Sequence, residues 1–398
     1  MPSTPRSRPT VLELLSDLIR INSVNPSYEG GVSEAAIVAY LQHYFQRNSV
    51  ETWQQEVFPG RPNLIARIPG RNPARRLVFE AHTDTVSVGG MSIPPFEPTV
   101  SEGRMYGRGA CDTKAGLAAM CFAAVSLKQE NIQPPCDIWV VAAADEEFSF
   151  GGARRFLEGT EAAGAIIAEP TRMRIAIASK GVLRWRIHCH GKAAHSSRPH
   201  QGVNAIGKMA HVIRILEEEN AKVQSVSHPL LGAPTLTVGI IQGGRQVNMV
   251  PDLCTIDLDR RLLPGERVGD VLNRYREILN SSLNLNVEFE APMLEDEALE
   301  TSVDSDIVQC ARAVAAEAGT DTTPIGVSFG SDASKFSRAG IPSIICGPGN
   351  IDLAHGAIEY IELEQVQLAS EFYRRLMLKF DEQTRNGEFA DALPAYGA

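Results

Sequence analysis

Short, nearly uninterrupted apolar runs recur along the chain, and each ends in acidic residues, a histidine or a glycine-rich loop. Four such runs cover residues 77–81, 137–144, 165–168 and 341–346. Runs of this length predict strands that are buried on both faces of a sheet. Between them lie segments with the spacing of amphipathic helices, at residues 11–19, 33–47, 117–127, 304–318 and 362–381. This alternation predicts an α/β fold with a mostly parallel central sheet and helices on both faces.

Polar side chains that can bind metal follow these predicted strands or precede a predicted helix. They are His82, Asp84, Asp112, Glu146, Glu147, Glu169 and His355. Because ligands gather at the carboxyl ends of parallel strands, we expect these side chains to lie close together. Carboxylates this crowded repel one another strongly unless a cation neutralises them. The pattern therefore predicts a metal cluster at this edge of the sheet.

Each of these residues has a plainer explanation when it is taken alone. His82 and Asp84 could belong to a polar loop, although a histidine ligand needs an acceptor for its second N–H and Asp84 stands where that carboxylate is expected. Asp112 could simply cap the helix that follows it. Glu146 and Glu147 are adjacent and leave a strand in different directions, so that one could bind metal while the other stays free.

A different pattern interrupts the chain at residues 180–292. Its predicted elements are a strand at 182–190, a helix at 203–218, strands at 235–242 and 253–262, a helix at 268–279 and a strand at 285–289. The order βαββαβ is that of a ferredoxin-like domain, a small sheet with two helices on one face. We therefore expect an inserted domain at 180–292 and a metal-binding domain made of residues 1–179 and 293–398.

The composition argues against some classes of function. The formal net charge of -10 and the pI of about 5.5 disfavour a nucleic-acid surface, which needs clustered Lys and Arg. No apolar stretch approaches the roughly 20 residues that cross a bilayer, and the first ten residues lead into an amphipathic helix instead of a signal-peptide pattern. The 7 cysteines are scattered without a Cys-x-x-Cys pair, which favours reduced thiols in a cytoplasmic protein. Negative charge at Asp112 raises the pKa of a neighbouring thiol, so we expect no nucleophile at Cys111.

The motifs resemble those of the co-catalytic zinc amidohydrolases, a family that includes acetylornithine deacetylase, succinyl-diaminopimelate desuccinylase, aminoacylase and glutamate carboxypeptidase. The motifs that occur in family order are His82-x-Asp84, Gly109-x-x-Asp112-x-Lys114, Asp145-Glu146-Glu147, Glu169-Pro170 and Ala354-His355. Within the insert, the motifs most similar to the acetylornithine deacetylase branch are Gly191-x-x-x-His195-Ser196-Ser197-x-Pro199, Gly202-Val203-Asn204-Ala205-Ile206 and Asp259-x-Arg261-x-x-Pro264-Gly265. The resemblance extends over most of the chain.

The resemblance implies a site for two metal ions. In the family pattern, Asp112 would bridge the two ions. His82 and Glu169 would complete the protein ligands of one ion, and Glu147 and His355 those of the other. Histidine and carboxylate ligands without thiolate suit Zn²⁺, which Co²⁺ or Mn²⁺ could replace.

The resemblance also implies roles for residues around the metal ions. Glu146 would be the general base, and Asp84 would be the partner that orients His82. His195 would donate a hydrogen bond to the oxyanion from the inserted lid domain, and in dimeric relatives this histidine comes from the partner subunit. Asn248 and Arg261 resemble lid residues that grip the substrate carboxylate. The alternation along the strand at 253–262 leaves the direction of Arg261 open.

The chain departs from the family pattern at two positions next to Asp112. The family often has Met where Thr113 stands and Gly where Ala115 stands. Neither position is a ligand in the family, so the expected chemistry is unaffected. The resemblance further implies a cis peptide bond between Asp112 and Thr113.

These inferences predict a zinc-dependent amidohydrolase that cleaves the amide bond of a small N-acyl amino acid and forms a homodimer through the inserted domain. A water activated by two metal ions would attack the amide carbonyl while Glu146 accepts its proton. A dipeptidase, tripeptidase or carboxypeptidase on the same scaffold is the nearest alternative. A non-catalytic binding protein that keeps the fold is a further one, and so is a dinuclear phosphoesterase, which usually needs more cationic groups than these motifs supply.

Overall fold

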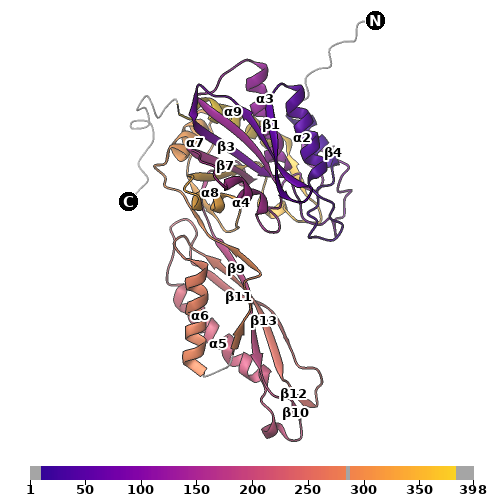
Figure 1. The fold of residues 1–398 in the computed structure, drawn as a ribbon, viewed down its shortest axis with the longest axis vertical. Helices are drawn as coiled ribbons and strands as arrows, with labels where there is room; N and C mark the ends of the chain where they lie inside the picture. Colours follow the sequence, from indigo (N-terminus) through magenta and orange to yellow (C-terminus); the bar gives the residue numbers. More distant parts are fainter. Residues whose placement is uncertain (1–9, 284–286, 382–398) are drawn as a thin grey trace. The chain divides into compact units, whose positions relative to one another are not determined.

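The computed structural model describes residues 10–283 and 287–381, which form two compact units. Of the described residues, the first unit contains 10–177, 301–325 and 331–381, and the second contains 178–300 and 326–330. The chain crosses between the units after residues 177, 300, 325 and 330, and the first three crossings lie within or next to β8 (Ala176–Ser179), β16 (Leu299–Glu300) and β17 (Ile325–Val327). Figure 1 shows the elements of each unit in their sequence colours.

A mostly parallel sheet forms the centre of the first unit, as the sequence predicts. Its strand order is β1-β2-β6-β3-β7-β18-β8. The bounds of the strands not yet given are β1 (Glu51–Phe58), β2 (Arg61–Ile68), β3 (Asn72–His82), β6 (Cys136–Ala143), β7 (Gly164–Pro170) and β18 (Ser343–Gly347). The four central strands β6, β3, β7 and β18 run parallel to one another, and β1, β2 and β8 add antiparallel pairs at the sides. The carboxyl ends of the central strands therefore meet at one edge of the sheet.

Helices cover both faces of this sheet. The unit contains α1 (Val11–Arg20), α2 (Ala35–Arg47), α3 (Lys114–Gln129), α4 (Gly151–Leu157), α7 (Asp306–Glu317), α8 (Ala333–Arg338) and α9 (Leu363–Lys379). On one face, the ring of Phe79 packs against Tyr373 of α9, which also contacts α3. On the other face, Trp139 packs against Phe156 of α4, and Phe156 against Phe336 of α8. These aromatic contacts close the core on both sides, as the continuous apolar strands require.

Several strands were not predicted from the sequence because they bury little apolar surface. Strand β1 has no fully buried residue, so its sequence carries no apolar run. A small sheet of order β19-β5-β4 lies in the same unit, with bounds β4 (Thr99–Ser101), β5 (Arg104–Tyr106) and β19 (Tyr360–Glu362). The pairing of β5 with β19 joins a segment before Asp112 to a segment after His355.

The second unit has the ferredoxin-like order that the sequence predicts. Its main elements are β9 (Gly181–His190), α5 (Ala205–Val223), β11 (Thr235–Gly243), β13 (Leu253–Leu262), α6 (Val268–Leu283) and β14 (Val287–Phe289). They form an antiparallel sheet of order β11-β13-β9-β14. Two short strands, β10 (Ala194–His195) and β12 (Met249–Val250), form a separate ribbon. Of the strand predicted at 285–289, Leu285 and Asn286 lie outside the described residues.

Both helices of the second unit pack on one face of its sheet. The core there includes Trp185 of β9, Met209 of α5, Leu258 of β13 and Tyr275 of α6. Residues 293–300, which the sequence analysis assigned to the other domain, also lie in this unit, because β15 (Leu294–Asp296) pairs with β9. Residues 326–330 belong to it as well.

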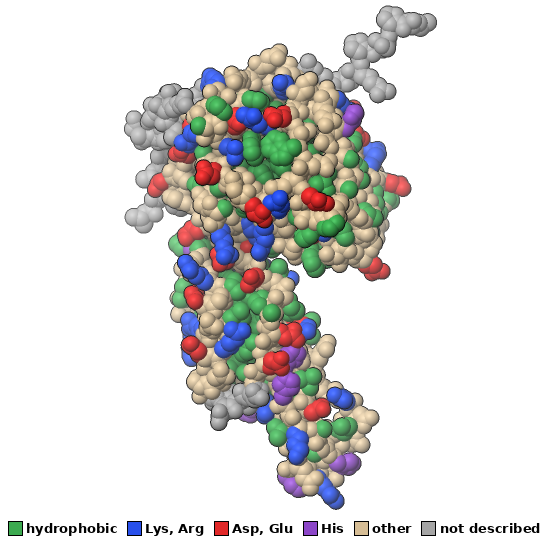
Figure 2. Space-filling view, viewed as in Figure 1, with side chains coloured by type: hydrophobic (Ala, Val, Ile, Leu, Met, Phe, Trp, Pro, Cys, Tyr) green, Lys and Arg blue, Asp and Glu red, His purple; other side chains and the backbone are tan. Residues whose placement is uncertain are grey.

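The surface carries both signs of charge. On the face shown in Figure 2, basic and acidic side chains are interspersed over both units. Among residues 10–283 and 287–381, no helix is long and apolar enough to span a bilayer.

Candidate metal centre

His82 is the last residue of β3, the central strand between β6 and β7, and its side chain is buried. Its Nδ1 lies 2.9 Å from the main-chain oxygen of Asp84, which can accept the Nδ1–H hydrogen bond. The carboxylate of Asp84 is farther away, with Oδ1 at 3.7 Å from Nδ1. The contact of His82 with Asp84 is therefore made by the main chain of Asp84, and not by the carboxylate that the sequence analysis expected. Nε2 is left to face the other polar groups.

The carboxylate of Asp84 instead holds the loop that carries the two glutamates. It accepts hydrogen bonds from the main-chain N–H of Glu146 at 3.1 Å and of Glu147 at 3.2 Å. The side-chain amide of Asn25 donates to the same carboxylate at 2.7 Å and to Asp145 at 2.9 Å. Burial raises the pKa of Asp84 to about 7, although the charge of His82 opposes the shift. Asp84 thus supports both the histidine and the acidic loop.

Two groups of potential metal ligands share one residue, Asp112. In the first group, Nε2 of His82 lies 3.0 Å from Oδ1 of Asp112 and 3.8 Å from Oε1 of Glu169. In the second group, Nε2 of His355 lies 3.2 Å from Oδ2 of Asp112 and 3.1 Å from Oε1 of Glu147. Within each group, one ligand atom from each residue lies within 4.8 Å of the others. Asp112 presents a different carboxylate oxygen to each group, which is the geometry of a bridging ligand.

The first group is buried and the second is open. The side chain of His82 is 1% exposed, whereas that of His355 is 50% exposed. Asp112 lies in the loop before α3, whose first residue is Lys114 and whose N-cap is Thr113. The peptide bond between Asp112 and Thr113 is cis, as the resemblance implied. Asp112 is therefore not the helix cap, which was the plainer explanation of its position.

The electrostatics show an excess of buried negative charge. Burial, together with the charge of Glu169, raises the pKa of Glu146 well above its usual value, and burial and the charge of Asp112 do the same for Glu169. Hydrogen bonds to Asp112 and Glu147 raise the pKa of His355 to about 10. Such shifts are expected where carboxylates and imidazoles crowd together without a cation to neutralise them.

Glu146 is close to the first group but does not belong to either group of ligand atoms. Its charge acts on both His82 and Glu169. A carboxylate next to a metal-ligand group, but outside it, is positioned to exchange protons with a bound water. Of the two adjacent glutamates, Glu147 thus belongs to one ligand group and Glu146 to neither.

The remaining predicted site residues lie in the second unit. His195 pairs with Met249 in the β10–β12 ribbon, and the N–H of Ser196 donates to the main-chain oxygen of Asn248 at 3.0 Å. His195 and Asn248 therefore lie together. Arg261 is near the end of β13 and donates from Nε to Asp259 at 2.9 Å.

The register of β13 decides the direction of Arg261. Arg260 is buried on the helix-covered face and Arg261 lies on the opposite face with Asp259. Asn248 precedes β13, whose eight residue steps from Leu253 to Arg261 span about 27 Å. His195 follows the end of β9 that pairs with the start of β13, whereas Arg261 is near the other end of β13, and Figure 1 shows the β10–β12 ribbon at one end of the unit.

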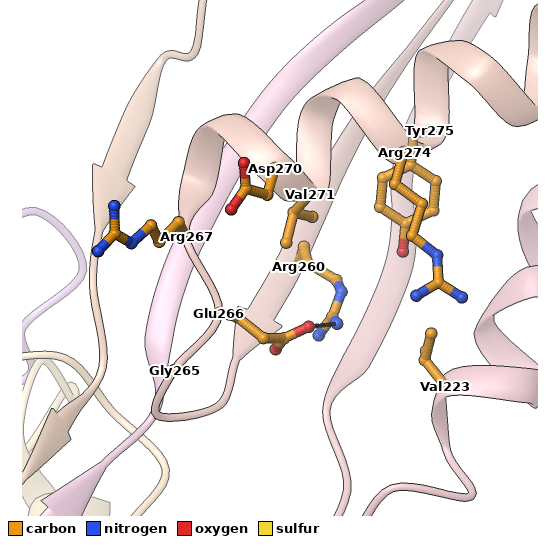
Figure 3. Close-up of a pocket in the computed structure, with 9 residues that line it drawn as sticks. All are labelled: Val223, Arg260, Gly265, Glu266, Arg267, Asp270, Val271, Arg274 and Tyr275. Carbon is orange, nitrogen blue, oxygen red and sulfur yellow. Dashed lines mark hydrogen bonds and ion pairs between the residues drawn. The ribbon is translucent and has the colours of Figure 1, made fainter.

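A pocket in the second unit lies beside α6 (Figure 3). It is lined by Val223, Arg260, Gly265, Glu266, Arg267, Asp270, Val271, Arg274 and Tyr275. Arg260 pairs with Glu266 at 2.6 Å, and Arg274 pairs with Glu219. The pocket therefore contains paired charges of both signs, and its residues are not among those that the sequence predicts for the reaction.

Sequence reasoning missed three polar residues that support the site: the buried Asn25 and Glu359, and Arg61, whose side chain is 13% exposed. Arg61 binds Glu34 at 2.5 Å and Asp145 at 2.7 Å. None of the three lies in an apolar run. Of the three, only Glu359 could have been suspected from its position in the sequence, because it follows His355 by four residues in the same loop.

Comparison with known proteins agrees with this geometry. Residues 78–379 match the profile of the protein family described as peptidase family M20/M25/M40. The chain belongs to this family. It is 32% identical over 319 residues to an acetylornithine deacetylase of Myxococcus xanthus, a match that covers 76% of this chain and 80% of the relative. It is 27% identical over 403 residues to a probable succinyl-diaminopimelate desuccinylase of Staphylococcus aureus, covering 93% and 97% of the two chains.

The fold of the M20 chain is also similar to solved structures. One is a tripeptidase from Staphylococcus aureus, with a TM-score of 0.78, 22% sequence identity, and coverage of 94% of this chain and 98% of the other. The resemblance to this hydrolase family and the α/β fold that the sequence pattern predicts are therefore confirmed.

Proposed function

We propose that this M20 hydrolase cleaves the amide bond of a small N-acyl amino acid with the help of two divalent metal ions. The observation that supports this most directly is the pair of ligand groups that share Asp112, each with one imidazole and two carboxylates. The most similar relatives described above include a deacetylase and a probable desuccinylase, which remove acyl groups from amino compounds. A linear amide is the bond common to both.

The donor set of the site suits two divalent ions. His82 and Glu169 would hold one ion, Glu147 and His355 the other, and Asp112 both. Because the ligands are two imidazoles and three carboxylates without thiolate, we propose Zn²⁺, with Co²⁺ or Mn²⁺ as replacements. When bound, the ions would polarise the substrate carbonyl and lower the pKa of a water toward 7.

The chain's own residues would handle the protons and the developing charge. Glu146 would accept a proton from the attacking water and pass it to the departing amine, so that the products are a carboxylate and a free amine. His195 would donate a hydrogen bond to the oxyanion on the substrate carbonyl carbon. Arg261 of one chain and Asn248, which lies with His195, of a second copy would bind the carboxylate of the substrate, for which the guanidinium offers paired donors.

The internal geometry of the second unit favours a homodimer. His195 and Arg261 are separated by most of the length of β13, so a small substrate cannot contact both residues of one chain. A second copy would supply the missing group. Strand β11 offers a surface for it, because it is an edge strand whose Ile240 and Ile241 are 52% and 55% exposed.

A second candidate function is peptide hydrolysis by the same residues. The tripeptidase of similar fold supports it, and neither the ligands nor Glu146 would distinguish a peptide from an acyl amide. A purely binding role is less consistent with the placement of Glu146, which contributes to neither ligand group. We also propose a cytoplasmic location, because the described cysteines are free and buried.

A substrate panel tests the proposal. Purified protein, stripped of metal and then reloaded with Zn²⁺, would be assayed for amine release from acetyl, succinyl and peptidyl amino acids, with and without chelator. We expect metal-dependent release from one acyl amino acid, and a 10² to 10⁴-fold lower rate in Glu146→Gln with unchanged metal content. Comparable turnover of dipeptides would favour the peptidase, and full activity after metal removal would refute both.

A further inference from the structure

Glu359 is a buried carboxylate that none of the proposed steps uses. Its side chain is 1% exposed, and both carboxylate oxygens are fully engaged. Oε1 accepts hydrogen bonds from the main-chain N–H of Cys111 at 2.9 Å and of Asp112 at 3.1 Å. Oε2 accepts from the N–H of Gly109 at 3.1 Å and from the guanidinium of Arg108 at 2.6 Å. One side chain thus binds three of four consecutive main-chain N–H groups from 109 to 112.

The position of Glu359 in the chain connects this loop to the second ligand loop. Glu359 follows His355 by four residues and directly precedes β19, which pairs with β5. The main-chain oxygen of Glu359 also accepts a hydrogen bond from Gly107 at 3.1 Å. The loops that carry Asp112 and His355 are therefore joined at Glu359 by both its main chain and its side chain.

The connection of the two loops at Glu359 matters because both ligand groups depend on Asp112. Asp112 must direct one carboxylate oxygen to each ligand group, so a small rotation of its main chain would spoil both groups at once. Its N–H donates to Glu359 at 3.1 Å, and hydrogen bonds to a charged carboxylate are stronger than those between neutral groups. Arg108 is also buried and donates to the main-chain oxygen of Ser87 at 3.0 Å, which fixes the carboxylate in turn.

We propose that Glu359 is a positioning residue that holds Asp112 and His355 in the geometry needed to bind two metal ions. The inference rests on the proposed dinuclear site and adds a residue that acts through the ligands without touching metal or substrate. Partners that orient ligands in this way typically change metal affinity by 10 to 100-fold when they are removed.

The test is metal titration of Glu359→Gln. Glutamine has nearly the same shape, but it is neutral and places an NH₂ donor against main-chain N–H donors. Full-length protein would be stripped with chelator and titrated with Zn²⁺ by calorimetry, and with Co²⁺ by visible absorption. We expect both dissociation constants to rise at least ten-fold, together with a changed Co²⁺ spectrum, because Asp112 serves both ions.

Asp137→Asn is the matched control. Asp137 is also buried, accepts from Arg67 at 2.8 Å and from the N–H of Gly70 at 2.9 Å, and lies at the start of β6, away from the ligand edge. The Asp137→Asn protein should be destabilised as Glu359→Gln is, while both of its metal dissociation constants stay within about two-fold of those of the unaltered protein. This control separates a weakened fold from a misplaced ligand.

The outcomes distinguish this inference from the proposed function. If the unaltered protein does not bind two ions, the dinuclear function fails. If it binds two ions and folded Glu359→Gln binds them equally well, only the positioning role is refuted. Should Glu359→Gln not fold, Arg108→Met removes the cation that fixes the carboxylate, and unchanged affinities in that variant would overturn the inference.

Discussion

The two histidines proposed as metal ligands should differ sharply in what they contribute to folding. Replacing His82 by alanine should lower the free energy of unfolding of the metal-free first unit by about 3 kcal/mol more than replacing His355. The side chain of His82 is 1% exposed, and that of His355 is 50% exposed. Both substitutions remove a contact with Asp112, so the difference between them reports mainly on burial.

The size of this difference follows from the void and the unpaired acceptor that remain when the buried ring of His82 is removed. His82→Ala opens a void of about 65 Å³, which at about 24 cal/mol per Å³ corresponds to about 1.6 kcal/mol. The main-chain oxygen of Asp84 loses the partner that lies 2.9 Å away, and an unsatisfied buried acceptor costs about 1 to 3 kcal/mol. His355→Ala leaves neither a closed void nor an orphaned carbonyl, because water can fill its place.

The measurement is urea unfolding in chelator, followed by tryptophan fluorescence. A Trp185→Phe background removes the tryptophan of the second unit and leaves Trp53 and Trp139, which pack together in the first with ring centroids 5.0 Å apart. The two histidine variants would be compared in that background. Equal losses, or a larger loss for His355→Ala, would show that the assignment of a buried and an open ligand group is wrong.

Two further predictions concern the packing around the site. The native protein should not react with a thiol reagent, because its cysteines are buried and burial raises the pKa of Cys136 to about 12 and that of Cys189 to about 11. All 7 cysteines should react after unfolding. Rapid labelling of the native chain would contradict this prediction. Arg61→Met should destabilise the first unit by about 3 to 5 kcal/mol, since it leaves the buried carboxylates of Glu34 and Asp145 without their cation. A loss below 1 kcal/mol by urea unfolding would refute the second prediction.

The apolar pattern was sufficient to predict the central strands, because strands buried on both faces are apolar throughout. The runs at 77–81 and 137–144 correspond to the ends of β3 and to β6, and their carboxyl ends carry the predicted ligands. Strand β1 was missed for the opposite reason, since an edge strand with a solvated face needs no apolar run. The division of the chain at 180 and 292 was less accurate at its second boundary, because β15 shows no pattern that assigns it to either unit.

The supporting contacts of the site could not be predicted from spacing. The two-residue interval between His82 and Asp84 is compatible with a side-chain or a main-chain acceptor, and the structure has the main chain. Glu359 contacts a loop about 250 residues earlier in the chain, so its role depends on the β5–β19 pairing, which neither short strand reveals in the sequence. The proposed ligands His82 and Glu169 lie at the ends of apolar strands and can be found by pattern, whereas the groups that contact the ligand loops come from unrelated segments.

The direction of the Arg261 side chain follows from the alternation of side chains along β13, which composition alone does not give. The sequence places Arg260 and Arg261 side by side, and it left the direction of Arg261 open. Because successive residues of a strand point to opposite faces, the apolar side chains before Arg260 direct it into the core, and Arg261 must then lie on the open face. Arg261 lies near the end of β13 and is therefore separated from His195 by most of the length of this strand. A single chain therefore cannot bring both groups to one small substrate, and this separation is the reason for the homodimer proposed above, in which a second copy would pair at the exposed edge of β11.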